Sequence, residues 1–233
     1  MVQLTSGLII DVIIPAFNEE KSIGKVIGDI PKIVRHIIVC SNASTDRTVE
    51  VAETHGAIVV KEPLRGYGNA CLKALAYIEQ LEIKPMIVVF LDGDYSDYPE
   101  ELTELVAPIV KNNFDLVIGS RDLGTKENGA MLPQQIFGNW LATRLIKLLF
   151  GYTFTDLGPF RAVTYSALQK INMVDKNYGW TVEMQVKAAK LRLRCTEIPV
   201  RYRKRIGQSK ISGTIKGTIS AGYKIILTIF RYI

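Results

Sequence analysis

The first 120 residues alternate short apolar runs with amphipathic stretches of about a dozen residues, and this alternation limits the possible folds more than any other feature. Strands that alternate with helices of this length predict βαβ units and an α/β fold with a mostly parallel sheet. The runs predicted as strands are Leu8–Ile14, Val34–Cys40, Ala57–Lys61, Met86–Leu91 and Phe114–Gly119. The stretches predicted as helices are 19–30, 45–55, 68–82 and 99–112.

Farther along, the pattern predicts helices over 132–150 and 180–191 and a strand over Cys195–Tyr202. Residues 211–232 place isoleucines on one side of a helix and lysine, arginine and hydroxyl residues on the other, which predicts a basic amphipathic helix. This helix is too charged to cross a bilayer. We therefore expect one catalytic domain over 1–210 and a helical appendage over 211–233.

The charge is distributed unevenly. From Lys187 onward the chain has twelve lysines and arginines and one acid, Glu197, whereas residues 1–186 carry a net charge of −5. A basic tail on an acidic body predicts a polyanionic partner, which is a phosphate, a nucleic acid or an anionic membrane surface. No secretory signal is expected, and the three scattered cysteines lack metal-ligand spacing, so a cytoplasmic protein is predicted.

Asp92-Gly93-Asp94 follows the apolar run Met86–Leu91 directly. Residues i and i+2 of an extended segment point the same way, and the carboxyl ends of parallel strands form the edge where such sheets bind ligands. Two carboxylates there predict a site for Mg²⁺ or Mn²⁺ shared with a substrate phosphate. The alternative is an Asp-Gly turn with two surface acids.

Three more segments reach the same edge of the predicted sheet: Ile13–Glu20, Val39–Asp46 and Ile118–Arg121. In combination with Asp92–Asp94, they make the sequence resemble glycosyltransferase family 2, which implies a GT-A nucleotide-diphospho-sugar transferase fold with helices on both faces of a Rossmann-like sheet. A narrower resemblance, to the polyprenyl-phosphate (dolichyl-phosphate) hexose synthases, rests on the stretches 137–139, 156–161, 178–185 and 205–214.

The family resemblance assigns nucleotide-sugar residues. Asn42 stands where many relatives have an aspartate that bonds the base, and its amide offers both a donor and an acceptor to a base edge. Asp46 either contacts the ligand or caps the following helix. The residues that the resemblance places in the nucleotide-sugar pocket are Pro15, Phe17, Asn18, Glu19, Asn42 and Asp92.

The resemblance also implies the metal ligands. Asp94 would coordinate a cation that bridges the diphosphate, and Asp92 would reach the ribose or the same cation. Related synthases have a glutamine ligand two residues beyond the motif, where this chain has Ser96 followed by Asp97. The third ligand is therefore expected to be either a water or Asp97.

The acceptor side is assigned in the same way. Arg121, Arg205 and Lys210 are implied to bind the acceptor phosphate, with Gly207–Lys210 closing over the diphosphate. Glu183 is either a general base or a structural acid paired with an arginine. The catalytic candidates are Asp94, Arg121, Lys210 and Glu183.

Together these features predict inverting transfer of a hexose from a nucleotide diphosphate sugar to a polyprenyl phosphate, by an enzyme peripheral on the cytoplasmic face of a membrane. The resemblance favours UDP-glucose over GDP-mannose as the donor. An acceptor phosphate is already ionised near neutral pH, so it needs positioning and charge stabilisation rather than deprotonation.

Three alternatives remain. The same fold could transfer sugar to a soluble saccharide or another hydroxyl acceptor, for which Glu183 would be the base. A non-catalytic polyanion binder is disfavoured, and no nucleic-acid partner is expected, because isoleucines rather than stacking aromatics interleave the basic tail. A pyrophosphorylase is disfavoured because no glycine-rich loop follows the first strand.

Overall fold

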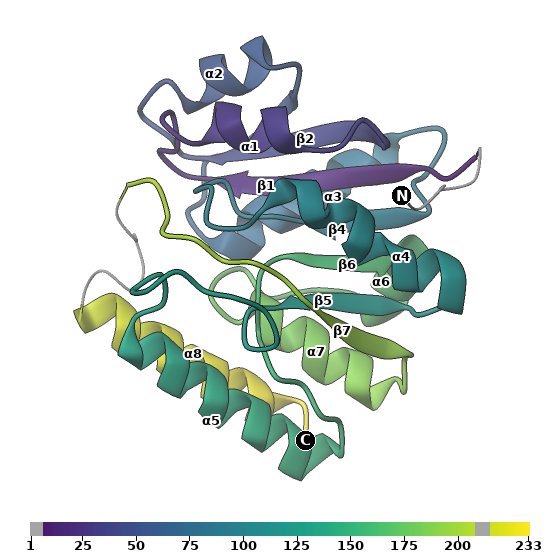
Figure 1. Cartoon of the computed structure of the whole chain (residues 1–233), viewed down its shortest axis with the longest axis vertical. Helices are drawn as coiled ribbons and strands as arrows, with labels where there is room; N and C mark the ends of the chain where they lie inside the picture. The colour runs from purple at the N-terminus through teal and green to yellow at the C-terminus, as the bar shows by residue number, and fades with distance from the viewer. Residues whose placement is uncertain (1–6, 208–214) are drawn as a thin grey trace.

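The computed structural model describes residues 7–207 and 215–233, with the side chains of the second segment described from Gly222 onward. Within these residues one seven-stranded sheet has the order β3-β2-β1-β4-β6-β5-β7 (Figure 1). All its neighbouring strands are parallel except at β6, which is antiparallel to both β4 and β5. The strands are β1 (Ile10–Ala16), β2 (Val34–Asn42), β3 (Ile58–Glu62), β4 (Ile87–Phe90), β5 (Leu116–Ser120), β6 (Arg161–Thr164) and β7 (Cys195–Pro199).

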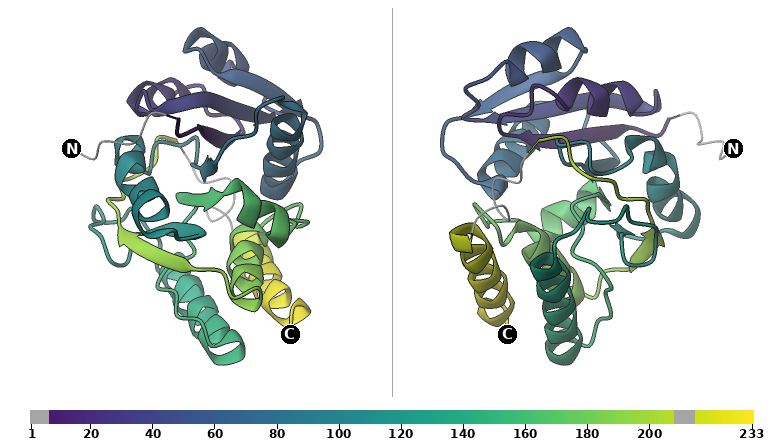
Figure 2. Two further views of the ribbon diagram at one scale, coloured as in Figure 1. Left: turned by 90° about the vertical axis from the view of Figure 1, so that its right-hand side faces the viewer. Right: turned by 60° about the vertical axis from the view of Figure 1, so that its left-hand side comes forward.

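Helices cover both faces of this sheet, as the two turned views show (Figure 2). They are α1 (Ile23–Asp29), α2 (Thr48–Thr54), α3 (Tyr67–Gln80), α4 (Leu102–Asn112), α5 (Pro133–Phe150), α6 (Tyr165–Ile171), α7 (Trp180–Lys190) and α8 (Ile215–Arg231), with a short 3-10 turn over Pro99–Glu101. Successive strand residues point to opposite faces, so Val12 packs with α1, α2 and α4 whereas Ile13 packs with α3 and α5–α8. The predicted α/β fold class is thereby confirmed.

The five strands predicted in the first 120 residues are all present, with ends that differ by up to two residues. Strand β6 and helix α6 were not predicted. Strand β6 has four residues and begins two residues after Pro159, so it is too short to show an alternating pattern. Its insertion between β4 and β5 depends on the tertiary fold and leaves no local signal.

Helix α8 is part of the larger core, because Ile229 is fully buried in the cluster that also contains α5 and α7 residues. The predicted polar side of this helix is not uniformly exposed. Thr228 is buried, and Lys224 pairs with Asp175 at 2.9 Å. The division into a domain over 1–210 and an appendage over 211–233 stays a prediction. In the part of the chain that the structure describes, no helix is both long and apolar enough to span a bilayer.

Candidate active site

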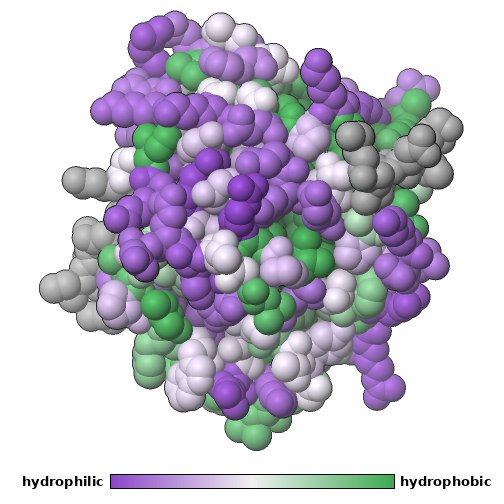
Figure 3. Space-filling model, viewed as in Figure 1, coloured by the Kyte–Doolittle hydropathy of each residue, from purple (hydrophilic) through white to green (hydrophobic). Residues whose placement is uncertain are grey.

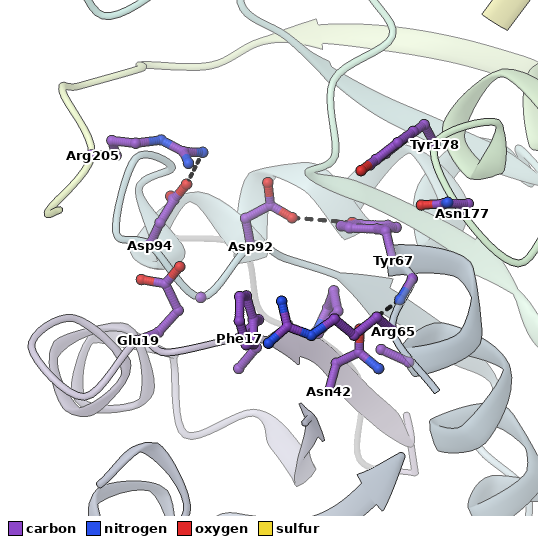
Figure 4. A pocket seen from close by; sticks show the side chains of 15 residues that line it. Phe17, Glu19, Asn42, Arg65, Tyr67, Asp92, Asp94, Asn177, Tyr178 and Arg205 are labelled. Atoms are coloured by element: carbon purple, nitrogen blue, oxygen red, sulfur yellow. Dashed lines mark hydrogen bonds and ion pairs between the residues drawn. The ribbon is translucent and has the colours of Figure 1, made fainter. Parts of the chain in front are cut away.

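A cleft of about 410 Å³ opens at the carboxyl ends of β1, β2 and β4. The strand register explains the position of the cleft. Ile13 of β1 pairs with Phe90 of the parallel strand β4, so the segments that follow the two strands lie at the same edge of the sheet. Figure 4 shows side chains from both halves of the chain pointing into this cleft. Its lining residues are Pro15, Ala16, Phe17, Glu19, Asn42, Arg65, Gly66, Tyr67, Ala70, Asp92, Gly93, Asp94, Asn177, Tyr178 and Arg205.

The two acids that follow β4 have different surroundings. Asp92 Oδ1 accepts a hydrogen bond of 3.1 Å from the Tyr67 hydroxyl. Burial, with the charge of Asp94 as the next cause, raises the pKa of Asp92 to about 7. Asp94 Oδ1 accepts from the amide and the hydroxyl of Ser96 at 2.9 and 2.6 Å. Two neighbouring carboxylates disfavour each other's charged form, so a nearby positive charge stabilises the pair.

Arg205 supplies part of that charge, because its guanidinium forms an ion pair with Asp94 Oδ2 (Figure 4). Burial opposes the charge on Arg205, but the carboxylate of Asp94 holds its pKa above the usual value. Backbone bonds set this position: Arg203 N donates to Ser96 O and Ile206 N to Asp94 O, both at 2.9 Å. The segment after β7 therefore runs alongside the Asp92–Asp94 loop.

The acid cluster fits a divalent cation at Asp92 and Asp94, since both line the cleft and hard cations prefer carboxylate oxygens. Asp97 is placed differently. It is 1% exposed, neither carboxylate oxygen has a hydrogen-bond partner, and it does not line the cleft. Burial, followed by the charges of Asp92 and Asp94, raises its pKa well above the usual value. Among the described residues, no three His, Cys, Asp or Glu side chains are arranged to hold a metal, so Asp97 is not brought together with the other two acids as a third ligand.

The nucleotide-sugar candidates separate into two groups. Three of the predicted residues of the loop after β1 line the cleft: Pro15, Phe17 and Glu19. Asn18 does not line it. Asn18 has a left-handed backbone, with φ of 55°, and its Oδ1 accepts from Thr45 N at 2.8 Å. Its side chain therefore joins the loop after β1 to the loop after β2 and is not part of the cleft wall.

Asn42 lines the cleft, but its amide holds the chain after β3. Its Nδ2 donates to Glu62 O at 3.2 Å and to Leu64 O at 2.7 Å, and its Oδ1 accepts from Gly66 N at 2.8 Å. Both amide hydrogens are thus used within the protein, which leaves one acceptor lone pair for a base. Asp46 has a structural role of the same kind, because it accepts from the amide and hydroxyl of Thr48 at the start of α2.

Arg65 and Tyr67 are among the lining residues that were not predicted as site residues from the sequence. Arg65 lies over the ring of Phe17, with its guanidinium carbon 4.1 Å from the ring centre, and Tyr67 bonds Asp92. The two glycines of Gly66-Tyr67-Gly68 could have indicated that another segment packs closely here. A Cβ on either glycine would collide with backbone of Asp175 or Lys176, so only glycines let that segment pack here. This packing brings Asn177 and Tyr178 into the cleft.

A second cavity of about 280 Å³ continues from the first, and the two share Tyr67, Asp92, Asn177, Tyr178 and Arg205. It runs between α5, α7 and α8, with Arg121 in its wall. The Arg121 guanidinium forms two parallel bonds with Asp156, at 2.7 and 2.6 Å. Despite the opposing effect of burial, the Asp156 carboxylate raises the pKa of Arg121 and the guanidinium lowers the pKa of Asp156. Asp156, rather than the adjacent Asp122, is thus the partner of Arg121.

Trp180 is a further feature of this second cavity. The residue lines the cavity and is 1% exposed, yet its Nε1 donor has no hydrogen-bond partner. Its ring packs edge to face on Phe90, with the ring centres 5.8 Å apart. A buried N–H without an acceptor lowers the stability of the folded protein.

Glu183 lines neither of the two cavities, and its role as a general base stays a prediction. It is fully buried and accepts from Val174 N, Asp175 N and the Tyr232 hydroxyl, and it pairs with Lys187 at 2.7 Å. The structural alternative therefore describes this residue, with a lysine in place of the expected arginine. Lys210 is a catalytic candidate on the basic tail, and it falls outside the described residues.

This fold, with a pair of acids and two arginines near the carboxyl edge of the sheet, is typical of nucleotide-sugar transferases of the GT-A class. The chain belongs to glycosyltransferase family 2: residues 11–172 match the family described as Glycosyl transferase family 2. The resemblance inferred from the motifs is thereby confirmed, and the protein is a glycosyltransferase.

Individual relatives agree with this assignment. The chain is 31% identical over 204 residues to a dolichyl-phosphate hexose transferase of Haloferax volcanii, covering 86% of this chain and 85% of the relative. It is 30% identical over 220 residues to an undecaprenyl-phosphate mannosyltransferase of Micrococcus luteus, covering 88% of each chain. The fold resembles glucosyl-3-phosphoglycerate synthase of Mycobacterium tuberculosis, crystallised with Mn²⁺, UDP-glucose and phosphoglyceric acid, with a TM-score of 0.76, 24% identity, and coverage of 97% of this chain and 80% of the other.

Proposed function

We propose that this enzyme transfers a hexose from a nucleotide diphosphate sugar, with UDP-glucose favoured, to a polyprenyl phosphate at the cytoplasmic surface of a membrane. The observation that carries this proposal is the junction of two cavities at Asp92 and Arg205. One cavity is lined by paired carboxylates and the other by the buried guanidinium of Arg121. A donor diphosphate with a cation suits the first, and an acceptor phosphate suits the second.

On the donor side, Phe17 and Arg65 form a flat surface suited to a nucleotide base, and Asp92 and Asp94 would hold Mg²⁺ or Mn²⁺. The bound cation would offset the negative charge that grows on the leaving diphosphate. Arg205 pairs with Asp94 in the structure, so a cation at Asp94 would free this guanidinium for a phosphate. Because Arg205 lines both cavities, it would reach either the donor or the acceptor phosphate.

On the acceptor side, Asp156 holds Arg121 through a bidentate pair whose side chains are 11% and 0% exposed. This pair occupies Nε and one hydrogen of Nη2, so the second Nη2 hydrogen and the Nη1 hydrogens of the fixed guanidinium would be the donors to a phosphate. Among the described residues that line the second cavity, Asp92 is the one acid and there is no histidine. A phosphate acceptor needs no base, since a phosphate monoester is largely ionised above its second pKa near 6. Arg121 in this wall supports a phosphate acceptor, whereas a hydroxyl acceptor would have Asp92, with its pKa raised to about 7, as the one carboxylate base among the described lining residues.

The second candidate is transfer to a soluble phosphate-bearing acceptor. It is favoured by the similar fold of glucosyl-3-phosphoglycerate synthase, whose crystals contain phosphoglyceric acid. Such an acceptor would also place a negative charge against Arg121, so the two candidates differ in whether the product is a lipid.

The proposal is tested by incubating the protein with Mn²⁺ or Mg²⁺, polyprenyl phosphate and radiolabelled UDP-glucose or GDP-mannose in parallel. We expect label in the organic phase that depends on the cation and disappears in Asp94→Asn. Release of UDP or GDP with label only in the aqueous phase would point to a soluble acceptor. No turnover with either donor would contradict the proposal.

A further inference from the structure

Helices α5 and α8 run side by side and in the same direction along one end of the molecule, below the sheet as drawn in Figure 1. Both expose large apolar side chains there, and we call these residues the α5–α8 apolar face. Two of them, Phe137 and Trp140, lie with ring centres 5.9 Å apart. The face consists of Phe137, Trp140 and Leu148 of α5 and Tyr223, Leu227 and Phe230 of α8.

The α5–α8 apolar face is not the side of either helix that packs on the protein core. The opposite side of α5 buries Ala142 and Ile146, and the opposite side of α8 buries Ile229. Each helix therefore already has one apolar side packed on the protein and carries a second one outward. Hydrophobic side chains reach the surface over α5 at the lower edge of the space-filling view (Figure 3). A cluster of this size on a water-exposed surface indicates a binding site.

The charge of the two helices indicates what binds there. Together α5 and α8 contain five basic residues and no acid. Arg144 and Lys147 are exposed beside the apolar residues of α5, and Arg231 is exposed at the end of α8. Exposed aromatic rings flanked by lysine and arginine are typical of surfaces that lie in the interface of an anionic bilayer. A protein partner of ordinary composition would not require this absence of acids.

The position of the second cavity fits the same partner. Gly138 of α5 and Ile225 of α8 line it, so the cavity that contains Arg121 is bounded by the helices that carry the face. A lipid phosphate could then reach Arg121 while its chain stays in the bilayer.

We infer that the α5–α8 apolar face docks on an anionic lipid bilayer and presents the second cavity to lipid phosphates; this inference rests on the proposed lipid acceptor.

The protein contains its own probe for this contact. Of its two tryptophans, Trp140 is 51% exposed on the face, whereas Trp180 is 1% exposed in the interior. Adding vesicles of phosphatidylcholine and phosphatidylglycerol is expected to shift the tryptophan emission to shorter wavelength. Brominated lipids should quench it, and Trp140→Phe should remove both effects. Pure phosphatidylcholine vesicles and salt of roughly 0.5 M should weaken binding, because the basic residues contribute through screened attraction.

Sedimentation with the same vesicles tests the face directly. Phe137→Ser combined with Leu227→Ser is expected to lower partition into anionic vesicles about tenfold, since each serine removes apolar area that the bilayer would bury. Ile83→Ser is a matched control: Ile83 and Phe137 are both 61% exposed, but Ile83 lies outside the face. It should bind within about twofold of wild type. All three residues are exposed, so thermal unfolding should confirm that the variants fold.

Activity separates failure of this inference from failure of the proposed function. The double variant should lose transfer to polyprenyl phosphate in vesicles about tenfold and keep transfer to a short, water-soluble prenyl phosphate. Wild type that labels neither lipid but still binds vesicles would refute the proposed acceptor and leave the face intact. Equal binding by wild type and the double variant would overturn the inference. So would a lipid-free wild-type dimer that the double variant converts to a monomer, because the occupant would then be a second copy of the chain.

Discussion

Replacing Asp92 with asparagine is expected to stabilise the ligand-free protein at high pH, although it removes a proposed metal ligand. Burial and the adjacent charge of Asp94 raise the pKa of Asp92 from 3.8 to about 7. The folded protein therefore holds this proton more tightly than the unfolded chain does. The stability contributed by the protonated carboxyl is complete below about pH 4 and is lost as the pH rises toward 7.

The magnitude follows from the size of the shift. A displacement of about three pKa units corresponds to roughly 4 kcal/mol at about 1.4 kcal/mol per unit. Asp92 faces an open cleft, so water screens part of this energy, and we expect Asp92→Asn to gain about 2 kcal/mol in the free energy of unfolding at about pH 8. For a chain of this length that is a rise in Tm of roughly 4–8 °C.

Thermal unfolding in the presence of a chelator, at about pH 5 and about pH 8, measures this effect. The gain should be much smaller at pH 5, where the folded wild type is already protonated at Asp92. Glu53→Gln, which changes an exposed acid on α2, should have no pH-dependent effect. Mn²⁺ with UDP should stabilise wild type more than Asp92→Asn, since the cation binds the folded carboxylate pair. Equal effects at both pH values, or a loss of stability at pH 8, would refute the reasoning.

Three other substitutions test the remaining parts of the site. Arg205→Ala should reduce transfer at least about tenfold. It should also tighten Mn²⁺ binding in the absence of nucleotide, because it frees Asp94 from its ion pair. Calorimetric titration with Mn²⁺ measures this affinity, and weaker binding would contradict the prediction. Asp156→Asn breaks the pair that orients Arg121, so it should cost about 3 kcal/mol of stability and raise the KM for the acceptor. Thermal unfolding measures the stability and kinetics at varied acceptor concentration measure the KM. An unchanged KM would argue against Arg121 as the acceptor site. Trp180→Phe keeps an aromatic ring against Phe90 and removes a buried N–H that has no partner, so it should cost less than about 3 kcal/mol of stability. Thermal unfolding measures this, and a larger loss would show that the N–H is bonded in the folded protein.

Much of the fold could be predicted because its determinants are local. The apolar runs before Asn18, Asn42 and Asp94 are strands whose carboxyl ends meet at one edge, and parallel pairing then brings those ends together without further information. Arg121 and Arg205 could be assigned through the family resemblance, and the structure places both in cavity walls.

The contacts of Glu183 and Asn42 could not be predicted, because for both residues the deciding contact comes from far along the chain. Glu183 stands in the first turn of α7, where an acid is normally exposed, and only the loop at Val174 and the Tyr232 hydroxyl bury it. Asn42 has the donors and the acceptor to read a base, yet the chain near Leu64 and Gly66 uses three of its bonding positions. The residue type alone gives no sign of either outcome.

The same long-range contacts give the cleft its chemistry. Asp94 and Arg205 are brought together because the segment after β7 bonds along the loop after β4, so an acid from the first half of the chain is neutralised by a base from the basic tail. Around them Asp92 carries a raised pKa, and Asp97 and the Trp180 N–H lack hydrogen-bond partners. Of these groups Asp92 lines the cleft, and a ligand that brings a cation would favour its charged form. The cost in stability at this edge of the sheet is therefore consistent with a site built around bound charge, rather than with errors of packing.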